Sequence, residues 1–79
     1  MSMIGIERIK EVLSAVIDVP IEQISDKASM DDIESWDSLA QMNLVIALED
    51  EFQLVIPDEE VGTLISIPLI LSLINEIVD

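Results

Sequence analysis

The sequence contains neither Cys nor His, and only three of its 79 residues are basic. Disulfides, the usual structural zinc sites and catalysis by Cys or His are therefore excluded. A domain of this size lies near the lower limit for burying a core without disulfides or a metal. We expect residues 1–79 to form a single domain that is stabilised by side-chain packing alone.

Aromatic residues are also scarce, at 3% of the chain, although hydrophobic residues make up 51%. The core must therefore be aliphatic, with Trp36 and Phe52 as the exceptions. The uncharged stretch 61–75 is too short to span a bilayer, and charged residues from Glu7 to Glu11 interrupt the apolar N-terminus before a signal sequence could form. We expect a cytoplasmic monomer with no membrane insertion.

Positive charge is nearly absent: the formal net charge is −14, and residues 28–79 hold 12 acids and no base. Binding to nucleic acid or to an anionic membrane is disfavoured, because each phosphate contact would be made against net repulsion. A basic protein partner is favoured instead, although the acids could also serve only to keep an aliphatic domain soluble. A calcium loop over residues 26–37 is excluded, because Asp31 stands where such a loop needs Gly. We expect no metal site.

Apolar periodicity predicts an all-α fold, a small four-helix bundle. A first amphipathic helix is expected over Ile4–Ile17, and the following residues 18–37 form a long loop without helical period, in which Ile21, Ile24, Met30 and Ile33 turn inward. Loops of this length in small domains are often functional. A second helix is expected over Ser38–Phe52, with Asp37 as its N-cap.

Two further helices are expected in the C-terminal third. A short third helix follows Pro57 over Asp58–Leu64, and Ser66 can cap a last helix that continues through Val78. Residues 54–56 could also form a short strand, but the sequence offers it no partner strand.

The second helix carries two apolar stripes on its wheel. The wider stripe holds Leu44, Val45, Leu48 and Phe52 and is expected to face the core. The narrower stripe holds Leu39, Met42 and Ile46, beside Ser38. It is either ordinary core or an exposed docking face with Glu49 and Asp50 at its charged rim.

Ser38 would be the first residue of that helix, where its hydroxyl lies near free backbone N–H groups and the positive end of the helix dipole. A phosphate on this hydroxyl would be stabilised. An arbitrary Asp-Ser pair at a helix start usually has no such role, so the pair alone predicts little.

The neighbouring residues make the pattern specific. Trp36-Asp37-Ser38-Leu39, the run over residues 44–52 and Ile56-Pro57-Asp58-Glu59-Glu60 together resemble the acyl carrier protein family, over nearly the whole chain. The resemblance implies that a separate magnesium-dependent transferase attaches 4′-phosphopantetheine to Ser38, with Asp37 and Leu39 flanking the attachment point. It implies that the thiol of this arm carries an acyl group as a thioester.

The resemblance also implies that partner enzymes with basic surfaces, which load and process the acyl group, dock on the second helix. The candidate docking residues are Leu39, Met42, Ile46, Glu49 and Asp50. The chain departs from the fatty-acid carrier pattern by holding Ser35 in place of Gly, and Ala40 and Asn43 in place of acids. A specialised lipid or secondary-metabolite pathway is therefore expected, with a fatty, polyketide-like, hydroxyacyl or aminoacyl cargo.

Two other classes remain as alternatives. An enzyme is disfavoured, because no His, Cys or clustered Lys is present and the carboxylates lie mostly on predicted solvent faces. A carrier-like helical interaction protein that is never loaded would share the fold and the acidic surface.

Overall fold

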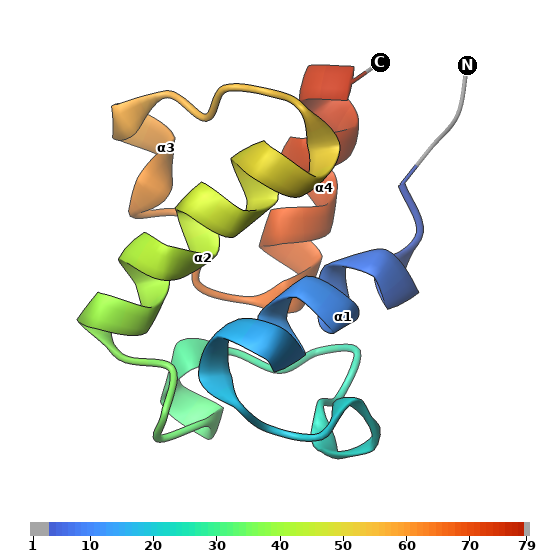
Figure 1. The fold of residues 1–79 in the computed structure, drawn as a ribbon, viewed down its shortest axis with the longest axis vertical. Helices are drawn as coiled ribbons and strands as arrows, with labels where there is room; N and C mark the ends of the chain where they lie inside the picture. The colour runs from blue at the N-terminus through green and yellow to red at the C-terminus, as the bar shows by residue number, and fades with distance from the viewer. Residues whose placement is uncertain (1–3, 79) are drawn as a thin grey trace.

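The computed structural model of the chain describes residues 4–78 and confirms the predicted all-α fold (Figure 1). Its helices are α1 (Ile6–Ile17), α2 (Ser38–Phe52), α3 (Asp58–Val61) and α4 (Ile67–Val78). Within the described residues the only β pairing is an isolated bridge between Ser29 and Ser66. Residues 54–56 are therefore not a strand.

Two helix boundaries differ from the prediction. α1 begins at Ile6 instead of Ile4, because the backbone of Ile4 pairs with the Asn75 side chain of α4: its N–H donates to Asn75 Oδ1 at 2.6 Å, and its carbonyl accepts from Asn75 Nδ2 at 3.1 Å. α3 ends at Val61 instead of Leu64, because the Leu64 N–H bonds three residues back, to the carbonyl of Val61, as in a tight turn.

The long loop between α1 and α2 is more regular than its sequence suggests. It contains two 3₁₀ turns, Ile21–Gln23 and Met30–Asp32. Ile24 is buried as expected, but the other three predicted anchors are only partly buried. The Met30 N–H donates to the Ile65 carbonyl, and the Ile67 N–H donates to the Ala28 carbonyl, both at 2.9 Å. These bonds tie the loop to the start of α4.

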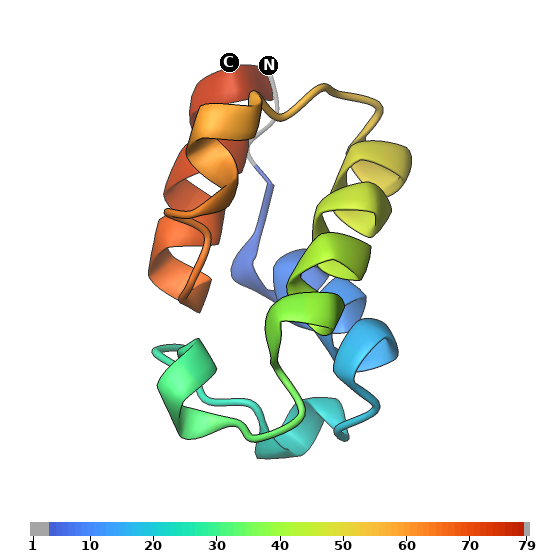
Figure 2. The same ribbon diagram turned by 90° about the vertical axis from the view of Figure 1, so that its left-hand side faces the viewer.

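The core lies where α1 packs against both α2 and α4 (Figures 1 and 2). It is almost entirely aliphatic, as the composition predicts, because the described aromatic residues are the buried Trp36 and the partly buried Phe52. Ser66 caps α4 as expected, with its Oγ accepting from the Leu69 N–H at 3.3 Å. The core residues with less than 2% exposure are Ile9, Leu13, Ile24, Trp36, Leu44, Leu48, Leu64, Ile67, Ile70 and Ile74.

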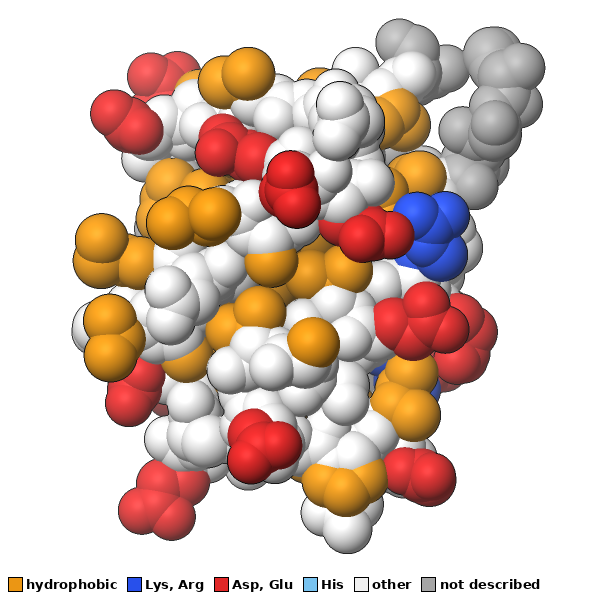
Figure 3. All heavy atoms as spheres, viewed as in Figure 1, with side chains coloured by type: hydrophobic (Ala, Val, Ile, Leu, Met, Phe, Trp, Pro, Cys, Tyr) orange, Lys and Arg blue, Asp and Glu red, His pale blue; other side chains and the backbone are white. Residues whose placement is uncertain are grey.

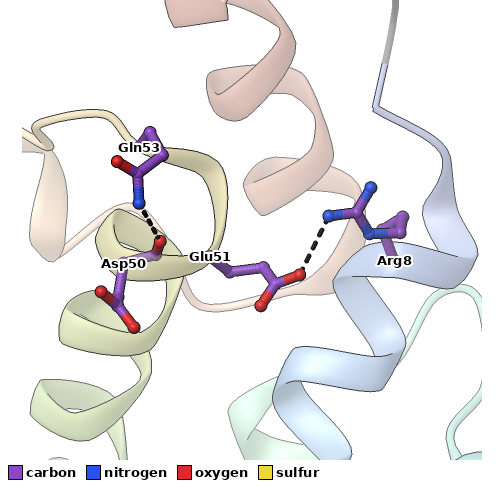
Figure 4. Close-up of polar contacts among 4 residues, drawn as sticks. All are labelled: Arg8, Asp50, Glu51 and Gln53. Carbon is purple, nitrogen blue, oxygen red and sulfur yellow. Dashed lines mark hydrogen bonds and ion pairs between the residues drawn. The ribbon is translucent and has the colours of Figure 1, made fainter.

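Only two ion pairs form within residues 4–78, and both use bases of α1. Arg8 contacts Glu51 at 2.9 Å (Figure 4). The Arg8 guanidinium also lies 5.1 Å from the centre of the Phe52 ring. Lys10 contacts Asp26 at 2.8 Å, and this hydrogen bond raises the pKa of Lys10 above its ordinary value. Most acids of the described residues therefore have no cationic partner. Figure 3 shows acidic side chains scattered over the visible face with few basic ones among them.

Salt is expected to stabilise this protein. Mutual repulsion among the acids of a chain with net charge −14 opposes folding. At 0.1–0.15 M, salt largely screens the repulsion between exposed charges that are more than about 8–10 Å apart. The melting temperature, followed by circular dichroism, should therefore rise steadily between low-salt buffer and 0.5 M NaCl. A melting temperature that does not change with ionic strength would mean that repulsion among the acids contributes little.

Candidate functional site

The first turn of α2 is fixed by Asp37. This residue is extended, with φ at −104°, and its Oδ1 accepts from the Ala40 N–H at 2.9 Å. Its carbonyl accepts the first intrahelical bond, from the Gln41 N–H at 2.8 Å. The predicted N-cap is confirmed, and Ser38 is the first helical residue. Such a cap is worth about 0.5–2 kcal/mol of helix stability.

The Ser38 side chain is exposed at this helix start. The first N–H group that donates within the helix is that of Gln41, and the Ala40 N–H donates to the Asp37 carboxylate. The N–H groups of Ser38 and Leu39 therefore have no partner within the helix. A phosphate on the Ser38 hydroxyl would thus lie near two N–H groups without helical partners and near the positive end of the helix dipole. The arrangement fits a serine that carries a phosphodiester.

The narrow apolar stripe of α2 is not core. Leu39 is 68% exposed, and Met42 and Ile46 are each 63% exposed, whereas Leu44 and Leu48 on the wider stripe are fully buried. Hydrophobic side chains project along the edge of the molecule where α2 begins (Figure 3). The stripe therefore starts one residue after Ser38 and runs along the surface of the helix.

The two acids proposed for the rim of this stripe differ in their surroundings. Asp50 is exposed, and its carbonyl accepts from Gln53 Nε2 at 2.8 Å (Figure 4). Glu49 is partly buried, and its Oε2 accepts from the Ile56 N–H at 2.8 Å. The Glu49 carboxylate thus also holds the segment that follows α2.

One apolar residue near the stripe was missed from the sequence. Val55 is 77% exposed and lines a shallow surface hollow together with Ile46 and Asp50. It lies beyond the end of α2, so the helical wheel could not have placed it beside Ile46.

The structure also gives a reason for one departure from the fatty-acid carrier pattern. Ala40, at a place where that pattern has an acid, is only 8% exposed, so a carboxylate there would have to be accommodated at a largely buried position. Asn43, at the second such place, is exposed.

Sequence reasoning also missed a buried polar residue next to the site. Gln41 is 8% exposed and accepts from the Trp36 indole N–H at 2.7 Å. Gln41 stands three residues before Leu44 and seven before Leu48, which places it on the wider stripe. A polar residue on this core-facing stripe could have indicated a buried hydrogen-bonding group.

Other kinds of site find little support in the part of the chain that the structure describes. No three acidic side chains in residues 4–78 come together as a metal site would need. Over the same residues, every helix is too short or too polar to cross a membrane.

Comparison with known proteins agrees with this geometry. The family model described as "Phosphopantetheine attachment site" matches residues 7–75. The solution NMR structure of holo acyl carrier protein from Geobacter metallireducens has a similar fold, with a TM-score of 0.80 and 23% sequence identity, over 92% of this chain and 84% of that one. The family resemblance, the fold and the predicted cofactor are thereby confirmed. The chain belongs to the phosphopantetheine attachment site family, whose prosthetic group is covalently attached 4′-phosphopantetheine, and it has the fold of an acyl carrier protein.

Proposed function

We propose that Ser38 is the attachment residue and that the chain carries acyl intermediates as thioesters for partner enzymes. One observation carries this proposal: an exposed serine occupies the first position of a capped helix, directly before an exposed apolar row. The arm supplies the terminal thiol for the thioester, which a chain without Cys cannot supply itself.

The residues of the chain have simple roles in this function. Asp37 holds the first turn of α2, so that the Ser38 hydroxyl points to solvent from a rigid helix end. In loading, the Ser38 Oγ bonds to the phosphorus of the pantetheine phosphate, the phosphoanhydride of coenzyme A breaks, and the nucleotide leaves. The transferase is expected to supply the base that takes the hydroxyl proton, because the chain has no His or Cys and no Lys after residue 27, and the Asp37 carboxylate is engaged with the Ala40 N–H. The resemblance implies that the transferase also brings the magnesium ion. The chain is then a substrate of enzymes and not itself a catalyst.

The narrow apolar stripe of α2 would serve as the docking surface. Leu39, Met42 and Ile46 provide an apolar centre, as found in protein interfaces. Asp50, with a smaller contribution from Glu49, would attract the basic surface of a partner and raise its association rate. Where fatty-acid carriers have an acid, this chain has Asn43. Its docking should therefore depend more on apolar contact than docking of fatty-acid carriers does.

The finer assignment follows from the attachment motif. Trp36-Asp37-Ser38-Leu39 resembles the motif of stand-alone carriers from specialised lipid or secondary-metabolite pathways. We place the protein in the cytoplasm as a monomer that meets its transferase and its acyl-loading and acyl-processing enzymes there.

Coexpression with a broad-specificity phosphopantetheinyl transferase, followed by intact-mass measurement, tests the function. The expected result is a mass gain of one phosphopantetheine and then, with acyl-loading enzymes, a second gain that hydroxylamine reverses. A chain that gains no mass would be an unloaded interaction protein. A chain that accepts only amino acids would be an aminoacyl carrier.

Shortening the side chains of the narrow apolar stripe should weaken docking without unfolding the protein. Met42→Ala and Ile46→Ala are each expected to reduce affinity for the cognate enzyme by about 1 kcal/mol or more, mainly through faster dissociation. Calorimetry and surface binding kinetics measure this, and Asn43→Ala on the same exposed surface is the control. Normal binding combined with a sharply lowered melting temperature would mean that the narrow apolar stripe belongs to the core and is not a docking surface.

A further inference from the structure

Helix α3 has little secondary structure of its own. It is four residues long, and its N-cap, Pro57, provides no side-chain hydrogen bond. The turn that follows is closed by bonds between residues three apart, from Thr63 N–H to Glu60 O at 3.0 Å and from Leu64 N–H to Val61 O at 3.3 Å. A single helical turn is unstable in isolation, so the position of α3 must depend on contacts from elsewhere.

The amide of Gln41 supplies such contacts. Its Nε2 donates to the carbonyl of Val61 at 3.1 Å and to that of Leu64 at 2.8 Å. Its Oε1 accepts from the indole N–H of Trp36, which is buried. The one amide group therefore bonds to the segment before α2 and to the end of α3. The bonds to Trp36 and to Leu64 are buried and the bond to Val61 is partly buried, so solvent does not readily replace the first two.

Gln41 is also placed to affect Ser38. It comes three residues after Ser38 on α2, and residues with this spacing are neighbours on a helix surface. The Gln41 N–H donates to the carbonyl of Asp37, the residue that caps the turn. A shift of α3 would thus be transmitted through one side chain to the turn that presents Ser38.

We propose that Gln41 is a positioning residue for the reaction at Ser38. It holds α3 and Trp36 against the first turn of α2, so that an enzyme acting on Ser38 meets α3 and the start of α2 as one rigid surface. This inference rests on the proposed function of Ser38. Gln41 does not contact the reacting atoms in this scheme, and its loss should weaken recognition of the carrier instead of the chemistry.

Gln41→Met tests the proposal, because it keeps the length of the side chain and removes all three hydrogen bonds. Gln53→Met is the matched control, since Gln53 also donates to a backbone carbonyl of α2 but lies on the surface. In Gln41→Met, amide hydrogen exchange at Thr63 and Leu64 should accelerate on the order of tenfold, while the Leu48 amide stays as protected as in the control. Emission of Trp36, the sole tryptophan, should shift because its N–H loses its acceptor.

The loading kinetics give the decisive readout. For Gln41→Met the KM of the transferase for the carrier should rise several-fold, on the order of threefold to tenfold, with kcat changed by less than about twofold. Ile74→Val, which shortens a fully buried side chain of α4 that takes no part in these bonds, controls for a loss of stability alone and should keep the wild-type KM. If Gln41→Met does not fold, Gln41→Glu replaces it, since a carboxylate still accepts from Trp36 but cannot donate to the two carbonyls.

The possible outcomes separate the two proposals. Wild-type KM and wild-type exchange at Thr63 and Leu64 in the Gln41 variant would overturn the role of Gln41. A KM that rises equally in Ile74→Val would also overturn it, because stability alone would then explain the effect. A wild-type chain that is never loaded would instead refute the function proposed for Ser38, and the exchange and emission data would still show whether Gln41 holds α3.

Discussion

Replacing Leu48 by alanine should lower the free energy of unfolding by about 2–5 kcal/mol, because the side chain is fully buried and its removal leaves a cavity. Small domains have total stabilities of only about 5–15 kcal/mol, so this one substitution should remove a large part of the stability. Leu39→Ala on the same helix is the matched comparison. Leu39 is 68% exposed, and its truncation should change the stability by no more than about 0.5 kcal/mol.

Urea unfolding followed by circular dichroism measures both variants under one set of conditions. The difference between them tests the assignment of the two stripes of α2. Similar losses of stability in the two variants would place Leu39 in the core. The surface proposed for docking would then have to be sought elsewhere.

Replacing Ser38 by alanine should abolish loading completely, because no other hydroxyl occupies the start of α2. The variant should fold as the wild type does, since Ser38 is exposed and the cap bond comes from Asp37, so its stability should change by no more than about 0.5 kcal/mol. Incubation with transferase and coenzyme A, followed by intact-mass measurement, gives the result. Circular dichroism of the same samples shows whether they are folded.

Ser35→Ala is the control for this experiment. Ser35 is also exposed and lies three residues before Ser38, but it precedes the cap and is not helical. Its variant should be loaded at the wild-type rate. Loading that persists in Ser38→Ala and disappears in Ser35→Ala would move the attachment point out of the helix.

The start of α2 could be predicted from sequence because its signals are local. Asp37 is a good N-cap, no Gly or Pro follows it until α2 has ended, and the apolar spacing is regular. The same reasoning placed α4 correctly from Ser66 and its broad apolar face. These elements are defined by residues a few positions apart, and the wheel shows which of their faces are apolar.

Features that depend on distant contacts could not be predicted in this way. α1 starts two residues later than predicted, because the Ile4 backbone bonds to Asn75, which is 71 positions away in the sequence. The order of the long loop depends on two backbone bonds at the start of α4: the Ala28 carbonyl accepts from the Ile67 N–H, and the Met30 N–H donates to the Ile65 carbonyl. Whether the narrow stripe of α2 faced core or solvent was likewise undecided, because a wheel shows two stripes but not which helices cover them.

Gln41 illustrates the same limit at the candidate site. Its place on the core face could be seen from the wheel, but its partners could not, since they lie five residues before it and 20 and 23 residues after it. A buried polar side chain among aliphatic residues must find hydrogen-bond partners, and only the fold shows which ones.

The most direct test of the central claim is to map the modification on the loaded wild-type protein. Cleavage after Glu34 and Glu49 releases residues 35–49, which contain only two serines, Ser35 and Ser38. Tandem mass spectrometry should find one phosphopantetheine on this fragment, attached to Ser38. An unmodified fragment from a protein whose intact mass has increased, or a group attached to Ser35, would contradict the assignment of Ser38.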